Sequence, residues 1–157
     1  MNPFLPPAAS SSLALAFRSL FLLPGLWAAT ATVARAQADL AGVWVMEGGR
    51  YTVQVTQQSR TWRGTIVALG PGVPPKDVHN PDPIRRTRNL VGADLFWNLR
   101  WNPTARRFTD GRIYAIDRGR EISAEAWLDD RNTLRVQGRV LLMTRTITFQ
   151  RALNSGR

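Results

Sequence analysis

The sequence predicts an all-β protein, an eight-stranded antiparallel up-and-down barrel. From Leu40 onward, apolar and polar residues alternate with a period of two, and the apolar positions are rich in β-branched and aromatic side chains. Turn-forming residues separate eight such segments. No segment has the spacing of an amphipathic helix. Short consecutive strands joined by turns favour a closed barrel, because closure removes the exposed edges of the sheet, and a β-sandwich is the alternative.

The segment before these strands, residues 1–36, has the composition of a secretory signal peptide. Arg18 precedes an apolar run over residues 19–34, which contains Pro24 and Gly25. That run lacks the roughly 20 unbroken apolar residues that a membrane-spanning helix needs. A positive residue followed by a short apolar stretch therefore indicates export, and an uncleaved membrane anchor is the alternative.

Small residues two positions apart mark where this leader would be removed. Ala34 and Ala36 flank one residue, and Ala36 and Ala38 flank the next pattern of the same kind. We expect cleavage after Ala36, with Ala38 as the second choice. The protein would then be periplasmic or secreted, and residues 37–157 would form a single β-barrel domain.

The first three predicted strands precede a long loop. Leu40–Met46 ends at a glycine-rich turn over 47–49, and Tyr51–Thr56 and Trp62–Leu69 follow it. The stretch Gly70–Asn89 is rich in proline and glycine. It cannot form a central strand, because proline lacks the N–H that the strand ladder requires.

Five further strands are expected after this loop: Leu90–Asn98, Gly111–Asp117, Glu121–Leu128, Thr133–Leu142 and Thr144–Arg151. The turn-like segments 117–119 and 129–132 would join consecutive strands as hairpins. A barrel of eight strands is just wide enough to be filled by its own side chains or to hold one small ligand.

The composition excludes several classes of function. The 157 residues contain no cysteine and one histidine, which excludes disulfides, thiolate metal sites, a cysteine nucleophile and a two-histidine metal site. Catalysis has little support, since there is no nucleophile elbow and no phosphate-binding loop, and we expect no cofactor. The formal net charge of +10 raises nucleic acid as a partner, but no recognition motif is present and export would remove that partner.

Several short segments carry a resemblance to a known family by their order and spacing. They are Leu40-Ala-Gly-Val-Trp44, Trp62-Arg-Gly-Thr-Ile-Val67, Lys76–Asp82, Arg86-Thr-Arg88, Leu90-Val-Gly92, Asp110–Tyr114, Gly119-Arg120, Leu134–Gly138, Thr144-Arg-Thr146 and Arg151. Over nearly all of the region after the leader, the chain resembles the small exported bacterial proteins grouped as domain of unknown function 2147. The resemblance implies a lipocalin-like barrel that can hold an internal ligand, and it implies no agreed activity.

The chain departs from the pattern of that family at a few positions. Phe108 and Phe149 stand where the family has tryptophan, and Ala115-Ile116 replaces an Asp-Pro pair. The segment from Leu141 to Thr144 is shorter than in the family. A site common to the family is therefore not expected at these positions.

The resemblance also implies a structural role for Gly42 and Trp44 at the start of the first strand. In lipocalin-like barrels such a tryptophan closes one end, and a late arginine, here Arg151 or Arg145, stacks across it. A guanidinium over an indole face gains about 0.5–2 kcal/mol. We favour this role over ligand contact, because a buried tryptophan usually belongs to the core.

The long loop contains the most concentrated polar residues of the chain. Asp77, Asn80 and Asp82 could offer oxygen ligands to a hard cation or polar groups at a barrel mouth, and the alternative is that they form Asx turns before proline. We expect no metal, because no calcium-loop spacing is present. Arg86 and Arg88 could clamp an anionic head group, or they could pair with Asp77 and Asp82 and lock the loop to the barrel, which we favour.

Aromatic residues outside the first strands are the remaining candidates for ligand contact. Trp97 and Trp101 are expected on one apolar face together with the other odd positions of 91–101, and Tyr114 follows on the next strand. They would line a ligand cavity in a hollow barrel and would be core residues in a filled one, which we favour.

The sequence therefore predicts an exported barrel that binds a small, partly apolar ligand such as a lipid or fatty acid. The alternative is a structural or interaction module of the cell envelope, with a packed barrel and a basic surface that meets anionic lipid or polysaccharide. An envelope enzyme is a third possibility with weaker support. Nothing in the sequence predicts an oligomeric state.

Overall fold

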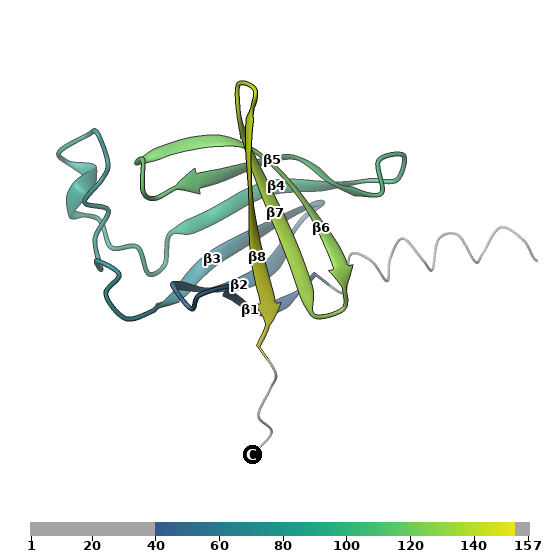
Figure 1. Cartoon of the computed structure of the whole chain (residues 1–157), viewed down its shortest axis with the longest axis horizontal. Helices are drawn as coiled ribbons and strands as arrows, with labels where there is room; N and C mark the ends of the chain where they lie inside the picture. Colours follow the sequence, from purple (N-terminus) through teal and green to yellow (C-terminus); the bar gives the residue numbers. More distant parts are fainter. Residues whose placement is uncertain (1–39, 153–157) are drawn as a thin grey trace, which may run out of the picture.

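The computed structural model describes residues 40–152, and these form one closed antiparallel barrel (Figure 1). Its strands are β1 (Gly42–Met46), β2 (Tyr51–Gln58), β3 (Thr61–Leu69), β4 (Asp94–Asn102), β5 (Arg107–Ala115), β6 (Arg120–Asp130), β7 (Thr133–Val140) and β8 (Met143–Arg151). Each strand pairs with the next, and β8 returns to β1 through the pair Trp44↔Arg151. The barrel prediction is confirmed, and the sandwich alternative is wrong. The leader expected over 1–36 lies outside the described residues.

Two predicted strands lie a few residues away from their expected places. β4 begins at Asp94 rather than Leu90, because the Leu90 N–H donates to the Pro75 carbonyl and the Gly92 N–H to the Ile66 carbonyl, which holds 90–93 in the end of the loop. β5 begins at Arg107 rather than Gly111. The preceding turn is formed by Asn102, whose side-chain oxygen accepts from the N–H groups of Thr104 and Ala105 at 3.0 Å.

The apolar alternation of β4 breaks at Asn98, so the predicted single face of odd positions is wrong. Asn98 has a φ of +60°, a left-handed conformation that asparagine tolerates. Leu95, Phe96 and Leu99 are all buried, so residues at odd and at even positions both face the interior. Trp97 pairs with Arg112 and is only half-buried. A local backbone kink of this kind leaves no mark in the hydrophobic pattern.

Aromatic side chains close one end of the barrel, which we call the closed end. This end carries the β2–β3, β4–β5 and β6–β7 turns. Trp62 packs edge-on against Phe108 at 6.3 Å between ring centres, and Trp101 packs against the same ring at 5.1 Å. Edge-to-face aromatic pairs are favourable beyond the area that they bury. The closed end is therefore filled by side chains.

Trp44 and Arg151 complete this end. Trp44 is fully buried and donates its indole N–H to the Leu40 carbonyl at 3.1 Å. The Arg151 guanidinium lies 4.2 Å from the centre of the Trp44 ring and donates to the Ala41 carbonyl at 2.7 Å. Gly42 has no side chain to obstruct it, since a Cβ there would lie 3.0 Å from an Arg151 guanidinium nitrogen. The arginine over the tryptophan is thus Arg151 and not Arg145.

Candidate functional site

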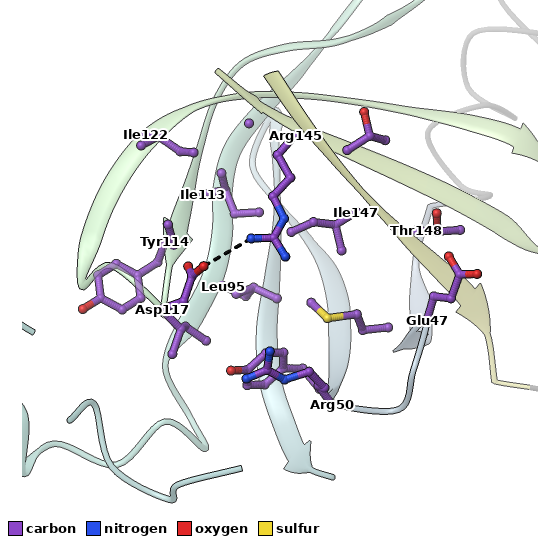
Figure 2. Close-up of a pocket in the computed structure, with 16 residues that line it drawn as sticks. Glu47, Arg50, Leu95, Ile113, Tyr114, Asp117, Ile122, Arg145, Ile147 and Thr148 are labelled. Atoms are coloured by element: carbon purple, nitrogen blue, oxygen red, sulfur yellow. Dashed lines mark hydrogen bonds and ion pairs between the residues drawn. The ribbon is translucent and has the colours of Figure 1, made fainter. Parts of the chain in front are cut away.

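A pocket of about 300 Å³ lies at the opposite end of the barrel, which we call the open end (Figure 2). This end carries the β1–β2, β3–β4, β5–β6 and β7–β8 connections, because alternate connections of an up-and-down barrel lie at opposite ends. Seven strands and two connections line the pocket, through Met46, Glu47, Arg50, Tyr51, Leu95, Ile113, Tyr114, Ala115, Ile116, Asp117, Ile122, Gly138, Arg145, Thr146, Ile147 and Thr148. The barrel is therefore filled at one end and hollow at the other.

The inner wall of this pocket is apolar. Leu95, Ile113, Ile122 and Ile147 project toward it from four different strands (Figure 2). Gly138 leaves room among them, because a Cβ there would lie 2.6 Å from the end of the Ile122 side chain. A largely apolar cavity with a few polar groups is the usual form of a small-molecule site.

Charged side chains stand at the mouth of the pocket. Arg145 and Asp117 approach each other across it from β8 and the β5–β6 connection, with a nitrogen to oxygen distance of 3.2 Å (Figure 2). Arg50 lies with its guanidinium carbon 5.6 Å from the Tyr51 ring centre. Within residues 40–152, Arg50 has no acidic partner closer than 4 Å. Glu47 adds one negative charge to the rim.

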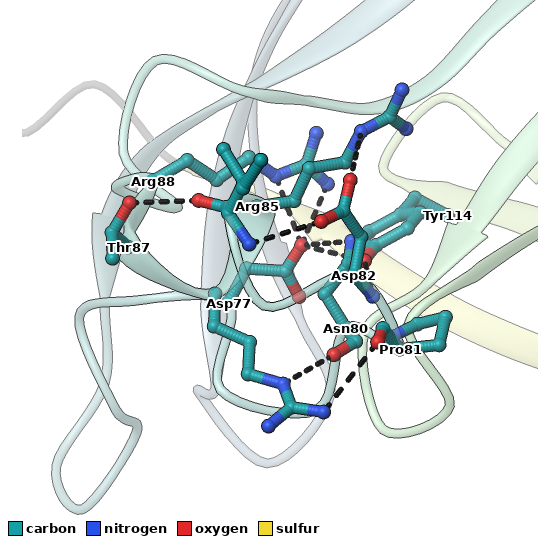
Figure 3. A network of polar contacts seen from close by, with 10 residues as sticks. Asp77, Asn80, Pro81, Asp82, Arg85, Thr87, Arg88 and Tyr114 are labelled. Atoms are coloured by element: carbon teal, nitrogen blue, oxygen red, sulfur yellow. Dashed lines mark hydrogen bonds and ion pairs between the residues drawn. The ribbon is translucent and has the colours of Figure 1, made fainter.

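A buried polar network beside the pocket holds the β3–β4 loop (Figure 3). One carboxylate oxygen of Asp77, which is fully buried, accepts from the Tyr114 hydroxyl at 2.6 Å, the Asn80 amide at 2.9 Å and the Arg88 Nε at 2.9 Å. The Arg88 guanidinium also lies 4.6 Å from the centre of the Tyr114 ring. The other Asp77 oxygen has no hydrogen-bond partner among the described residues. The network joins the loop to β5.

Backbone packing seats the same loop on the β5–β6 turn. Gly119 lies so close to it that a Cβ there would be 2.4 Å from the His79 carbonyl oxygen. Gly119 also has a φ of +59°, so glycine is required on both counts. Since Tyr114 lines the pocket as well as bonding to Asp77, the loop and the pocket wall share one side chain.

The polar loop residues expected to be ligands or turn formers serve mainly as turn formers. Asn80 Oδ1 accepts from the Asp82 N–H at 3.0 Å, and Asp82 Oδ1 accepts from the Ile84 N–H at 2.9 Å, which are Asx turns. These turns lead into the 3₁₀ helix η1 (Arg85–Thr87). In the part of the chain that the structure describes, no group of three or more His, Asp or Glu side chains is placed to hold a metal ion.

Of the two arginines expected to pair with acids of the loop, only Arg88 does so. Arg88 pairs with Asp77 at 2.9 Å, as expected. Asp82, however, pairs with Arg85 at 3.5 Å, and Arg86 donates to the backbone carbonyl of Asn80 at 2.7 Å. The pairing of Arg86 with an acid is therefore wrong, because η1 turns Arg85 toward Asp82.

Of the aromatic candidates, the structure places only Tyr114 at the pocket. Trp97 lies on the same face as Arg112, and Trp101 packs on Phe108 at the closed end. The pocket residues that sequence reasoning did not single out include Ile122, Ile147 and Arg50. Their strands were predicted, but which end of a barrel stays hollow depends on how its side chains pack.

Comparisons with known proteins agree with this fold. The model of the family "Uncharacterized protein conserved in bacteria (DUF2147)" matches residues 42–151. The chain belongs to this family. A solved structure described as protein HP1028 from the human pathogen Helicobacter pylori, which belongs to the lipocalin family, is similar with a TM-score of 0.62 and 18% sequence identity, over 73% of this chain and 84% of that one. At that identity the likeness shows the fold, and no curated protein matches the chain.

No helix within residues 40–152 is long and apolar enough to cross a membrane. The recognised family model covers β1 through β8, so the pocket and the Asp77 network both lie inside the matched region. The family match therefore covers the part of the chain that contains the candidate site.

Both tyrosines of the chain lie at this pocket, and both should titrate late. Burial is the main cause that raises the pKa of Tyr51 and of Tyr114 above 10.0, and the Asp77 carboxylate raises that of Tyr114 further. Ultraviolet titration of the folded protein should show phenolate forming at higher pH than in urea. The contribution of the two tyrosines to stability should be constant below pH 10 and decrease above it, because the unfolded tyrosines lose their protons first. Coincident titration curves in the two states would contradict this assignment.

Proposed function

We propose that this protein is exported and that its open-end pocket binds a small, partly apolar, anionic ligand of the medium-chain fatty acid type. The observation that carries the proposal is the combination of an apolar inner wall with a guanidinium, that of Arg50, at the mouth. A hydrocarbon chain placed on Leu95, Ile113, Ile122 and Ile147 would leave water behind. A carboxylate at the rim would meet Arg50 and the Tyr51 hydroxyl there.

The volume of the pocket supports a ligand of modest length. About 300 Å³ corresponds to about ten groups of water size, at roughly 30 Å³ each. A saturated chain of about ten carbons fits this volume with its charged end at the mouth. Decanoate is therefore the probe that the geometry favours.

Filling the pocket should abolish binding. In Ile122→Trp, the larger side chain would occupy the cavity, because Ile122 is only half-buried and faces that space. Isothermal titration calorimetry with decanoate should show binding to the wild type and a loss of at least tenfold in affinity for this variant. Ser123→Trp is the matched control, since the neighbouring position is exposed on the outer face.

Comparing two ligands on the wild-type protein tests the charged end. Decanol has the same chain as decanoate but no carboxylate, so it should bind at least tenfold more weakly if Arg50 holds the anion. Equal affinity of Ile122→Trp and Ser123→Trp for decanoate, or no heat with either ligand, would refute the proposed function.

The proposal of export rests on the leader at residues 1–36. Arg18, the short apolar run and the alanines before Gln37 form the pattern of a cleaved signal. Cell fractionation should recover the protein outside the cytoplasm, with an N-terminus at Gln37 or Asp39. Recovery of an exported chain that still begins at Met1 would contradict cleavage.

A further inference from the structure

The large apolar side chains that the barrel leaves exposed gather at the open end. Val67 lies in the last part of β3, and Val78, Ile84 and Val91 lie in the β3–β4 loop. The other three are consecutive, Leu141, Leu142 and Met143, at the β7–β8 connection. Within residues 40–152, the turns of the closed end have no such residue. Apolar exposure confined to one end of a molecule indicates a surface for another partner.

The β7–β8 tip, which we define as Leu141–Met143, is the most exposed of these features. Leu141, Leu142 and Met143 are 91%, 100% and 71% exposed. The strands pair up to Val140↔Met143, so the hairpin reaches its full length and projects beyond the barrel in Figure 1. Nothing in the described residues covers the three side chains.

The tip uses residues that a hairpin turn does not favour. The connection has two residues, Leu141 and Leu142, and Leu141 has a φ of +53°. Two-residue turns with a positive φ favour glycine or asparagine, which adopt that conformation readily and are not apolar. A leucine pair there costs stability and solubility in the isolated protein. The apolar tip therefore points to a role outside the barrel.

Basic residues surround the tip. Arg139 and Arg145 flank it on β7 and β8, and Arg118 and Arg120 stand at the neighbouring β5–β6 turn. Arg118, Arg120 and Arg139 are exposed and have no acidic partner within 4 Å in the described part of the chain. The Arg145 side chain is 74% exposed, and it forms an ion pair with Asp117. Positive charges around an exposed apolar tip complement a surface with an anionic outer layer above an apolar interior.

We propose that the β7–β8 tip inserts into the surface of an anionic lipid bilayer, with the surrounding arginines on lipid phosphates. A protein partner fits less well, because a stable interface needs about 800 Å² on each side and a tip of three residues is too narrow. A bilayer accepts a narrow apolar point, and each nearby arginine adds to the attraction of an anionic surface.

This orientation would bring the pocket to the membrane. Arg145, Thr146 and Ile147 line the pocket and follow the tip on β8, separated from it by Thr144 alone. A lipid-derived ligand could then pass between bilayer and pocket along β8 with little exposure to water. Insertion of the tip itself does not depend on the ligand, so the two proposals can fail separately.

Vesicle flotation tests the insertion. The wild-type protein should float with vesicles of phosphatidylcholine and phosphatidylglycerol, and floating should decrease with salt. The double variant Leu141→Gly and Leu142→Ser should bind at least tenfold more weakly. It should fold, because glycine relieves the positive φ at position 141. Ile84→Ser is the matched control, since Ile84 is exposed at the same end but lies in the loop.

The outcomes separate the alternatives. Arg139→Gln should weaken binding to anionic vesicles and leave binding to pure phosphatidylcholine unchanged. Wild-type protein that fails to float, or a double variant that floats as well as the wild type, would overturn the proposal. It would equally be overturned if the tip instead joined two copies, seen as a wild-type dimer in analytical ultracentrifugation that the double variant dissociates. The affinity for decanoate in solution is measured without vesicles, so it does not depend on the outcome of these experiments.

Discussion

Replacing Trp44 with alanine is expected to lower the free energy of unfolding by about 3–5 kcal/mol. Trp44 is fully buried at the closed end, and its removal leaves a cavity and deprives the Arg151 guanidinium of the indole face beneath it. The Leu40 carbonyl also loses its donor. Urea denaturation followed by far-ultraviolet circular dichroism measures the change, because that signal reports mainly the backbone and does not rely on tryptophan fluorescence.

Trp127→Ala provides the comparison for Trp44→Ala. Trp127 also lies under an arginine, Arg107 at 4.8 Å, and its N–H donates to Asp129 at 2.9 Å, but it is only half-buried on the outer face. Its loss should cost about 1 kcal/mol, since partners near the surface are replaced by water. Similar destabilisation by the two substitutions would mean that Trp44 does not support the closed end.

Replacing Asp77 with alanine is expected to release the β3–β4 loop and to cost about 3 kcal/mol. The Asp77 carboxylate accepts hydrogen bonds from Tyr114, Asn80 and Arg88. Alanine at this position removes the acceptor and leaves these donors without their partner. Limited trypsin digestion should cut rapidly within residues 70–93, and urea denaturation should show the lower stability.

Asp82→Ala is the matched control in the same loop. The Asp82 side chain is 45% exposed. Its ion pair with Arg85 at 3.5 Å and its hydrogen bond from the Ile84 N–H both lie near water, so their loss should cost only about 1 kcal/mol. Trypsin should cut this variant at nearly the wild-type rate. The idea that Asp77 holds the loop fails if the two variants are digested equally fast.

These effects describe a barrel that is filled at one end and hollow at the other. Aromatic packing and the Trp44–Arg151 pair fill the closed end. At the open end, the Asp77 network positions Tyr114 in the pocket wall. A loosened loop in Asp77→Ala should therefore also weaken decanoate binding, although Asp77 does not line the pocket.

Most of the strand order could be predicted from sequence because it depends on local pattern. The alternation in Tyr51–Gln58 and the hairpin turns are local properties, and they predict both the strands and their pairing. β4 begins later than the pattern predicts because the Leu90 N–H bonds back to the Pro75 carbonyl, and its alternation breaks because Asn98 takes a left-handed φ. Neither feature has a signature in composition.

The candidate site was less predictable because its parts come from distant segments. Asp77 and Arg88 belong to one loop, so their alternating charges indicated a pair, which the structure contains. Tyr114 joins them from β5, and Ile122 and Ile147 meet across the barrel from β6 and β8. Long-range contacts of this kind follow from strand register and barrel closure.

The all-β class, the antiparallel order and the polar character of the long loop follow from local sequence, because period-two alternation and turn chemistry act over a few residues. Three features follow only from the folded barrel: which end is filled, which arginine covers Trp44, and the place of the pocket among Leu95, Ile113, Ile122 and Ile147. These features depend on packing. Whether a side chain fills the interior or leaves it hollow depends on the neighbours that closure brings to it.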